Sequence, residues 1–182
     1  MRTGRLLFAG LMSAVALGAL QGSGAAEPAV PKTNLQLTML TKVNVYGLAL
    51  WDITNGAMDA RAAIDASKLK EVDWARLIEI GRALEEGGRA LASRNGIVVA
   101  APGAKLQDEG NADASSAADV QRYVDAKPEV FRQHAQALQK TGAGVMEAAR
   151  KRDARQLGDL SNSLDAVCEN CHVTFWYPQL TK

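Results

Sequence analysis

Both cysteines of this chain and one of its two histidines lie within five consecutive residues, Cys168-Glu169-Asn170-Cys171-His172. The spacing C-x-x-C-H is the attachment pattern of a covalently bound c-type haem. Residues three and four positions apart share one face of a helix, so the three side chains can reach the same flat group. The two thiols would form thioethers with the vinyl groups along one porphyrin edge, and the imidazole would coordinate the iron as proximal ligand. The pattern therefore predicts one covalently attached haem c at Cys168, Cys171 and His172.

Other chemistries use two cysteines at this spacing, and a chance match is also an alternative. A thioredoxin-like dithiol would make the protein a thiol-disulfide oxidoreductase, but that motif belongs to a βαβ unit, and the sequence shows no clear strand. A structural zinc site normally has four ligands, whereas this chain has no third cysteine and only one further histidine, His134. Haem attachment agrees best with the rest of the chain.

Residues 1–26 have the pattern of a secretory signal peptide. Arg2 and Arg5 precede an apolar run at 6–20, and small residues follow up to Ala26, which predicts cleavage at that point. An uncleaved membrane anchor is the alternative, but this run is shorter than the roughly twenty residues that span a bilayer. Export together with c-type attachment, which needs reduced thiols and haem delivered on the same side, predicts a location in the bacterial periplasm.

Residues 27–182 are expected to form a single domain with a hydrophobic core. Without Arg2 and Arg5 the basic residues fall from 21 to 19, against 20 acidic residues. A chain so close to neutral gives no indication of nucleic-acid binding. No membrane span is expected once the signal peptide is cleaved.

Apolar residues recur at helical spacing in four long stretches. We expect helices at 33–55, 73–93 and 128–151, and a fourth that begins at the N-cap Asp153 and carries the haem motif on its last turns. The predicted fold is all-α, a four-helix bundle with covalent haem on the C-terminal helix and a long loop at 96–117 between helices 2 and 3.

Two features of these helices and of the loop remain open. The apolar patch at 97–99 either packs against the bundle or covers a haem edge, and the loop after it ends in one or two helical turns. Gly81, Gly87 and Gly88 lower helix propensity in the second helix. They mark either a close approach of a neighbouring helix or of the haem, or a locally weak helix.

The signal peptide, the four helices and the position of the motif resemble the class II c-type cytochromes, meaning cytochrome c′ and its low-spin relatives. The resemblance covers nearly all of 27–182. It rests mainly on the haem motif with the following Phe175-Trp176-Tyr177-Pro178, and on the first helix, where Met39 precedes Trp51 by twelve residues. Class I cytochromes carry their motif near the N-terminus, so the position of the motif distinguishes the two classes.

The resemblance implies that the first helix faces the distal side of the haem. A methionine there gives a six-coordinate, low-spin iron suited to electron transfer, whereas an apolar residue gives a five-coordinate iron that binds small gases such as NO or CO. Met39 is the candidate distal ligand, with a core-filling role as its alternative, and a small rotation would present Leu40 instead. Cytochrome c′ proteins usually carry a basic residue four positions after the proximal histidine. This chain has Trp176 there, which weakens the transfer of gas binding.

The leading expectation is therefore a periplasmic electron carrier rather than an enzyme, with other redox proteins as partners. Cytochrome c′ relatives are often dimers, so a second copy is a further expected partner. Weaker ligand candidates are His134, Met58 and Met146. Candidates for packing on the macrocycle, or for ordinary core, are Trp51, Trp74, Phe131, Phe175 and Trp176.

Overall fold

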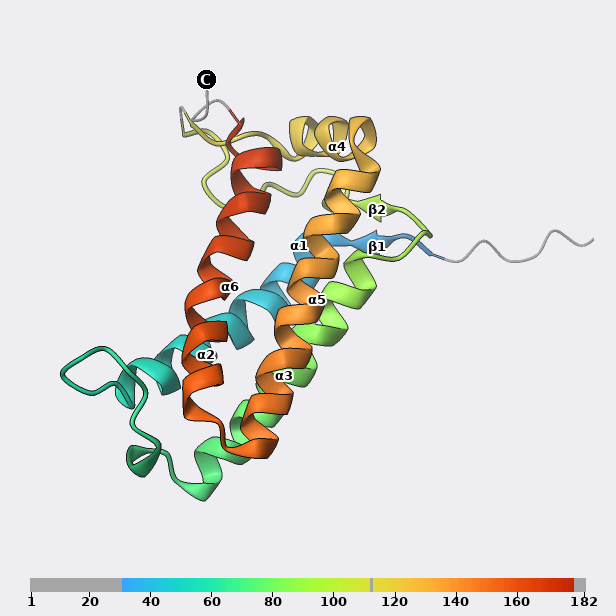
Figure 1. Cartoon of the computed structure of the whole chain (residues 1–182). Helices are drawn as coiled ribbons and strands as arrows, with labels where there is room; N and C mark the ends of the chain where they lie inside the picture. The colour runs from blue at the N-terminus through green and yellow to red at the C-terminus, as the bar shows by residue number, and fades with distance from the viewer. Residues whose placement is uncertain (1–30, 112, 179–182) are drawn as a thin grey trace, which may run out of the picture.

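The computed structural model describes residues 31–111 and 113–178, and the predicted signal peptide at 1–26 lies outside them. Most of the described residues are helical, and the strands are few and short (Figure 1). The expectation of an all-α protein is confirmed. No helix within the described ranges has an apolar stretch long enough to cross a bilayer.

The first predicted helix is present, but it is not α-helical throughout. It consists of α1 (Leu35–Thr38), the π-helical turn η1 (Met39–Val43) and α2 (Asn44–Gly56). The backbone N–H of Asn44 donates to the carbonyl of Met39, five residues earlier. Such π turns are rare, and they are frequent at functional sites. The turn begins at Met39, the candidate distal ligand of the sequence analysis, and it changes the direction of the side chains that follow it.

The other long helices are α3 (Glu71–Leu91), α5 (Pro128–Lys151) and α6 (Ala154–Phe175). The Asp153 side chain accepts from the backbone N–H of Gln156 at 2.9 Å, which confirms the predicted N-cap of the last helix. α3 packs against α5, α5 against α6, α6 against α2 and α2 against α3 (Figure 1). The largest fully buried side chains lie on these four helices and in the loop before α4; they include Leu50, Leu77, Ile80, Leu84, Val99, Val145, Leu157 and Leu164.

The glycines of α3 serve the approach of neighbouring helices. A Cβ added at Gly81 would lie 2.8 Å from the carbonyl oxygen of Gly142 on α5, and one added at Gly88 would lie 2.8 Å from the carbonyl oxygen of Ala135. The backbones of α3 and α5 therefore touch, with no room for a side chain. Gly87 faces the first helix instead, where an added Cβ would lie 3.1 Å from Val43. Close helix packing, rather than a weak helix, explains these residues.

The connection between α3 and α5 is more ordered than the predicted loop at 96–117. Its strand β2 (Ile97–Val98) pairs in parallel with β1 (Thr33–Asn34), just before the first helix. The helix α4 (Ala117–Ala126) follows and is longer than the one or two turns expected. The expectation that the chain has no strand was wrong here, because two-residue strands are too short to show alternation. The pairing fixes this connection against the first helix.

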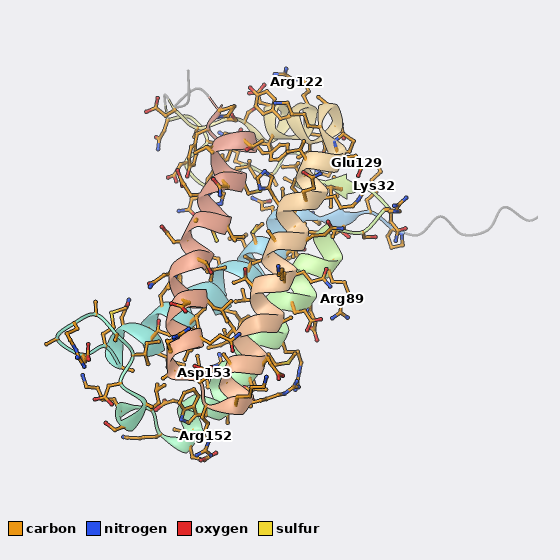
Figure 2. All side chains as sticks on the ribbon, viewed as in Figure 1. Lys32, Arg89, Arg122, Glu129, Arg152 and Asp153 are labelled. Atoms are coloured by element: carbon orange, nitrogen blue, oxygen red, sulfur yellow. The ribbon has the colours of Figure 1, made fainter. Side chains whose placement is uncertain are left out.

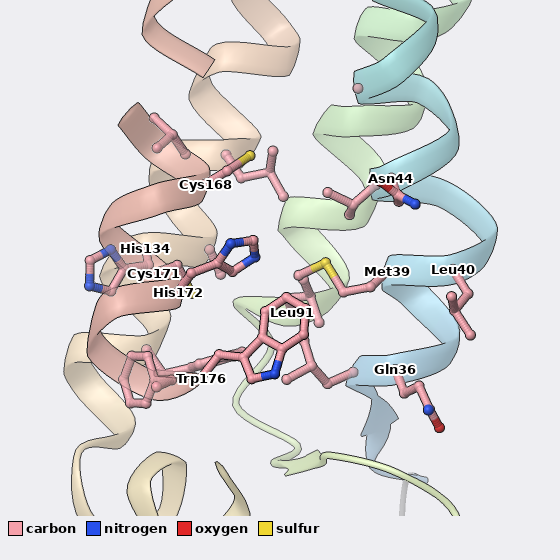
Figure 3. Close-up of a pocket in the computed structure, with 18 of the residues that line it drawn as sticks. Gln36, Met39, Leu40, Asn44, Leu91, His134, Cys168, Cys171, His172 and Trp176 are labelled. Carbon is pink, nitrogen blue, oxygen red and sulfur yellow. The ribbon is translucent and has the colours of Figure 1, made fainter. Parts of the chain in front are cut away.

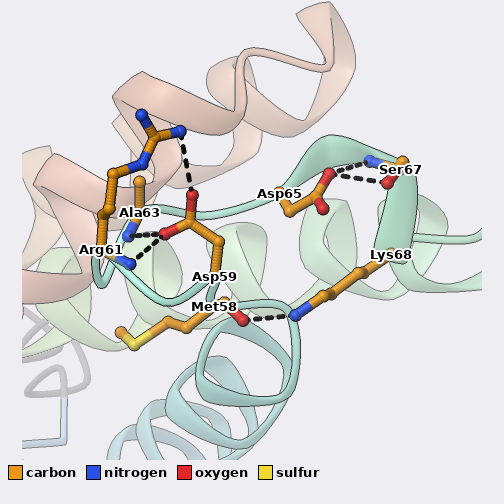
Figure 4. A network of polar contacts seen from close by, with 7 residues as sticks. All are labelled: Met58, Asp59, Arg61, Ala63, Asp65, Ser67 and Lys68. Atoms are coloured by element: carbon orange, nitrogen blue, oxygen red, sulfur yellow. Dashed lines mark hydrogen bonds and ion pairs between the residues drawn. The ribbon is translucent and has the colours of Figure 1, made fainter.

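The connection between α2 and α3 lies at the end of the molecule opposite the last turns of α6 (Figure 1) and includes the 3-10 turn η2 (Ala66–Lys68). Figure 4 shows how Asp59 organises it: one carboxylate oxygen accepts from the backbone N–H groups of Arg61 at 2.8 Å and Ala63 at 3.0 Å. These bonds hold the pKa of Asp59 below its usual value. The Lys68 ammonium donates to the carbonyl of Met58. This connection is therefore a structural turn that stabilises the entry into α3.

Charged side chains such as Arg89, Arg122 and Arg152 project outward from the helices (Figure 2). Arg152, in the left-handed conformation that ends α5, forms an ion pair with Glu71 at the start of α3. Arg89 pairs with Glu85 one turn earlier on α3 at 2.7 Å. Exposed pairs of this kind contribute little to stability, so the fold depends on the apolar contacts between the helices.

Candidate functional site

A cavity of about 310 Å³ lies between the first helix, α3, α5, α6 and the connection after β2. Its volume is near the lower end of the range for sites that bind small organic groups. Most of the residues that line it are apolar; they include Leu35, Met39, Val43, Leu84, Leu91, Val99, Leu106, Phe131, Leu138, Leu164 and Phe175. The apolar stripes that build the core also build this wall.

Cys168, Cys171 and His172 all line this cavity from α6. Their spacing of three and four residues brings them to one side of the helix, as the sequence predicted. Each is partly buried, and both cysteines are free thiols. Two thiols and one imidazole therefore border the same apolar space.

Met39 lies on the opposite wall. Figure 3 shows its side chain extending from the first helix into the cavity toward His172, while Leu40 points away. Leu40 is 55% exposed and lies at the rim. Between the two neighbours that the sequence left open, the structure places Met39 opposite the histidine.

Aromatic rings hold His172 in place. Its ring packs edge-on against Trp176, with centroids 5.0 Å apart, and against Tyr177 at 5.8 Å. Its backbone carbonyl accepts from the N–H groups of both residues, at 2.7 and 3.0 Å. The Tyr177 hydroxyl in turn donates to Glu169 at 2.8 Å. The end of α6 therefore fixes the direction of the imidazole.

Burial sets the protonation of the three motif side chains. It raises the pKa of the Cys168 thiol to about 11 and that of Cys171 to about 12, and the nearby Asp165 and Cys168 act in the same direction. A reactive redox dithiol needs the opposite shift, toward a thiolate at neutral pH. Burial also lowers the pKa of His172, despite the nearby Glu169. The imidazole is then neutral at pH 7, as a metal ligand must be.

The weaker ligand candidates do not face His172. His134 borders the cavity from α5, but Figure 3 shows its ring on the other side of α6. There it packs edge-on against Phe175 at 6.0 Å. Met58 belongs to the turn between α2 and α3, and Met146 lies at the crossing of α3 and α5. Neither methionine lines the cavity.

Most of the aromatic residues that the sequence suggested for packing on the macrocycle line the cavity, and one does not. Trp51, Phe131, Phe175 and Trp176 line the cavity, whereas Trp74 is buried in the core away from it. The indole N–H of Trp51 donates to the carbonyl of Ser161 at 3.1 Å.

Sequence reasoning left undecided what the connection after β2 contributes. Val99, Leu106 and Gln107 close one end of the cavity. The backbone N–H of Gln36 donates to the carbonyl of Val99 at 2.9 Å. The side-chain amide of Gln36 donates to the carbonyl of Lys105 at 2.6 Å. The apolar patch at 97–99 was the one signal of this role: Val99 lines the cavity, whereas Ile97 and Val98 pair with the strand before the first helix.

No protein family, no curated protein and no solved structure matches this chain. Within the ranges that the structure describes, no three or more His, Cys, Asp or Glu side chains come together as a metal site. A haem needs less from the protein, because its iron already has four ring nitrogens and takes only axial ligands from side chains. The residues around the cavity fit that requirement.

Proposed function

We propose that this protein is a c-type cytochrome that carries electrons. One observation supports the proposal above all: His172 and Met39 lie on opposite walls of an apolar cavity that both cysteines of the motif also line. The chemistry of these four side chains is that of two thioethers and two axial ligands. This set of four side chains is the basis for the proposed function.

Each residue of the site has a defined part in binding. Cys168 and Cys171 would retain the haem covalently through two thioethers. Their raised thiol pKa values disfavour the thiolate that a redox dithiol would use. His172 would be the proximal ligand and Met39 the distal one. When bound, haem supplies one-electron chemistry between Fe(III) and Fe(II), with no substrate bond made or broken. The apolar wall keeps water from the site, and methionine ligation raises the reduction potential.

The fold supports the same proposal. We interpret the four helices, which contact one another in a ring, as a four-helix bundle, an architecture that holds cofactors between facing helices. With the motif on the last helix and Met39 on the first, the chain has the arrangement that the resemblance to class II c-type cytochromes implies. We place the protein with the low-spin members of that class.

Location and partners follow from the sequence and from one surface feature. The signal peptide at 1–26 directs the protein to the periplasm, where c-type haem is attached. Leu37 and Leu40, 58% and 55% exposed, lie on the first helix beside Met39. These exposed apolar side chains, of which Leu40 lies at the rim of the cavity, provide the small, weak contact surface that is usual for encounters between redox proteins.

The visible spectrum of the exported protein before and after CO addition tests the proposal. A carrier with Met39 bound shows a Soret band and a low-spin ferrous spectrum that CO leaves unchanged. A ferrous spectrum shifted by CO would instead indicate an open distal position and the gas-binding alternative. A protein purified from the periplasm without any Soret band would overturn the haem proposal altogether.

A further inference from the structure

The indole N–H of Trp176 lies buried in the wall of the cavity without a partner. Its Nε1 atom has no solvent contact and no hydrogen-bond acceptor anywhere in 31–111 and 113–178. An indole N–H can only donate, and buried donors in folded proteins are nearly always paired. The acceptor for this donor therefore has to come from outside the described residues.

The position of this donor is fixed by the backbone around it. The backbone N–H of Trp176 donates to the carbonyl of His172 at 2.7 Å. The backbone carbonyl of Trp176 accepts from the N–H of Ser115 at 3.0 Å. The ring also packs edge-on against the imidazole, at an interplanar angle of 84°. Figure 3 shows the indole inside the cavity, next to His172. A group bound to the His172 imidazole would therefore lie next to the Trp176 indole.

Two neighbouring donors on the cavity wall are already occupied. The indole of Trp51, which lines the same cavity, donates to Ser161, and the side-chain amide of Gln36 donates to Lys105. Trp176 thus differs from these two neighbours. Its indole N–H is a buried donor without a partner, in a wall that is mostly apolar.

We propose that Trp176 is a positioning residue that donates a hydrogen bond through Nε1 to a propionate carboxylate of the bound haem. The inference rests on the proposed function. The ring nitrogens of haem are taken by the iron, so the propionates are the acceptors it offers. A hydrogen bond to a carboxylate is stronger than one between neutral groups, and it would fix the orientation of the propionate edge relative to His172.

Resonance Raman spectra of the ferrous holoprotein test this in Trp176→Phe, with Trp51→Phe as the matched control. Both variants lose one indole N–H from the same cavity, but the Trp51 N–H is already paired within the protein. The propionate bending mode is expected to move to lower frequency in Trp176→Phe and to stay at the wild-type position in Trp51→Phe. An unmoved mode in Trp176→Phe, with the Soret band intact, would overturn the inference and leave the proposed function standing.

A second measurement needs no variant. In the diamagnetic ferrous wild-type protein, the Hε1 proton of Trp176 should show nuclear Overhauser contacts with propionate methylene protons. If that proton is assigned and the contacts are missing, the inference is wrong even where Trp176→Phe fails to fold. Wild-type protein that carries no haem at all would overturn the inference and the proposed function together.

Discussion

The Cys168→Ala/Cys171→Ala variant is expected to lose its haem and most of its cooperative folding. Without haem, the apolar cavity of about 310 Å³ has nothing to fill it. At roughly 24 cal/mol per Å³, leaving it empty costs up to roughly 7 kcal/mol, which is comparable to the entire stability of a typical domain, about 5–15 kcal/mol. Urea unfolding followed by circular dichroism should show a broad transition at much lower urea than in the wild type.

Asn170→Ala is the matched control, because this residue lies between the two cysteines on the exposed side of α6. It should keep both the haem and the wild-type unfolding midpoint. A haem-free double variant that still unfolds sharply, at the wild-type urea concentration, would show that the helices do not need the cofactor.

The Met39→Ala variant is expected to convert a low-spin haem into a high-spin one. Removal of the sulfur opens the distal position opposite His172, so the weak near-infrared band of methionine–iron ligation should disappear and CO should bind the ferrous form. The reduction potential should fall by a fraction of the roughly 0.8 V range that axial ligands span. Absorption spectra and a redox titration measure all three changes.

Leu40→Ala serves as the control for this substitution. It removes a side chain of similar size from the next position of the same helix, but that side chain points outward and is 55% exposed. The variant should keep the near-infrared band and the potential of the wild type. Equal behaviour of the two variants would mean that Met39 only fills space in the wall.

The long helices were predictable because their signals are local. Periodic apolar residues marked all four, and Pro128 and Asp153 marked the starts of the last two. The glycines of α3 could be noticed but not interpreted, since their reason lies in a neighbouring helix. Position 88, for example, holds a glycine because the backbone of α5 passes beside it.

Local spacing predicted one wall of the candidate site, whereas Met39 on the other wall was suggested by the resemblance, with Leu40 left open. Cys168, Cys171 and His172 are close in sequence, so their spacing alone brought them together. The choice between Met39 and Leu40 depends on how this part of the first helix is rotated relative to α2. The π turn at 39–43 changes that relative rotation, and apolar periodicity does not show it. The closing of the cavity by Val99 depends on a two-residue strand pairing across more than sixty residues, for which the sequence has no local signal.

Covalent attachment of haem at Cys168 and Cys171 is the central claim, and the mass of the exported protein after unfolding tests it most directly. We predict that the denatured chain keeps the added mass of one haem, and that a proteolytic peptide containing 168–172 carries all of it. A denatured chain with the mass of the mature polypeptide alone, purified from cells that attach haem to other c-type cytochromes, would contradict the account.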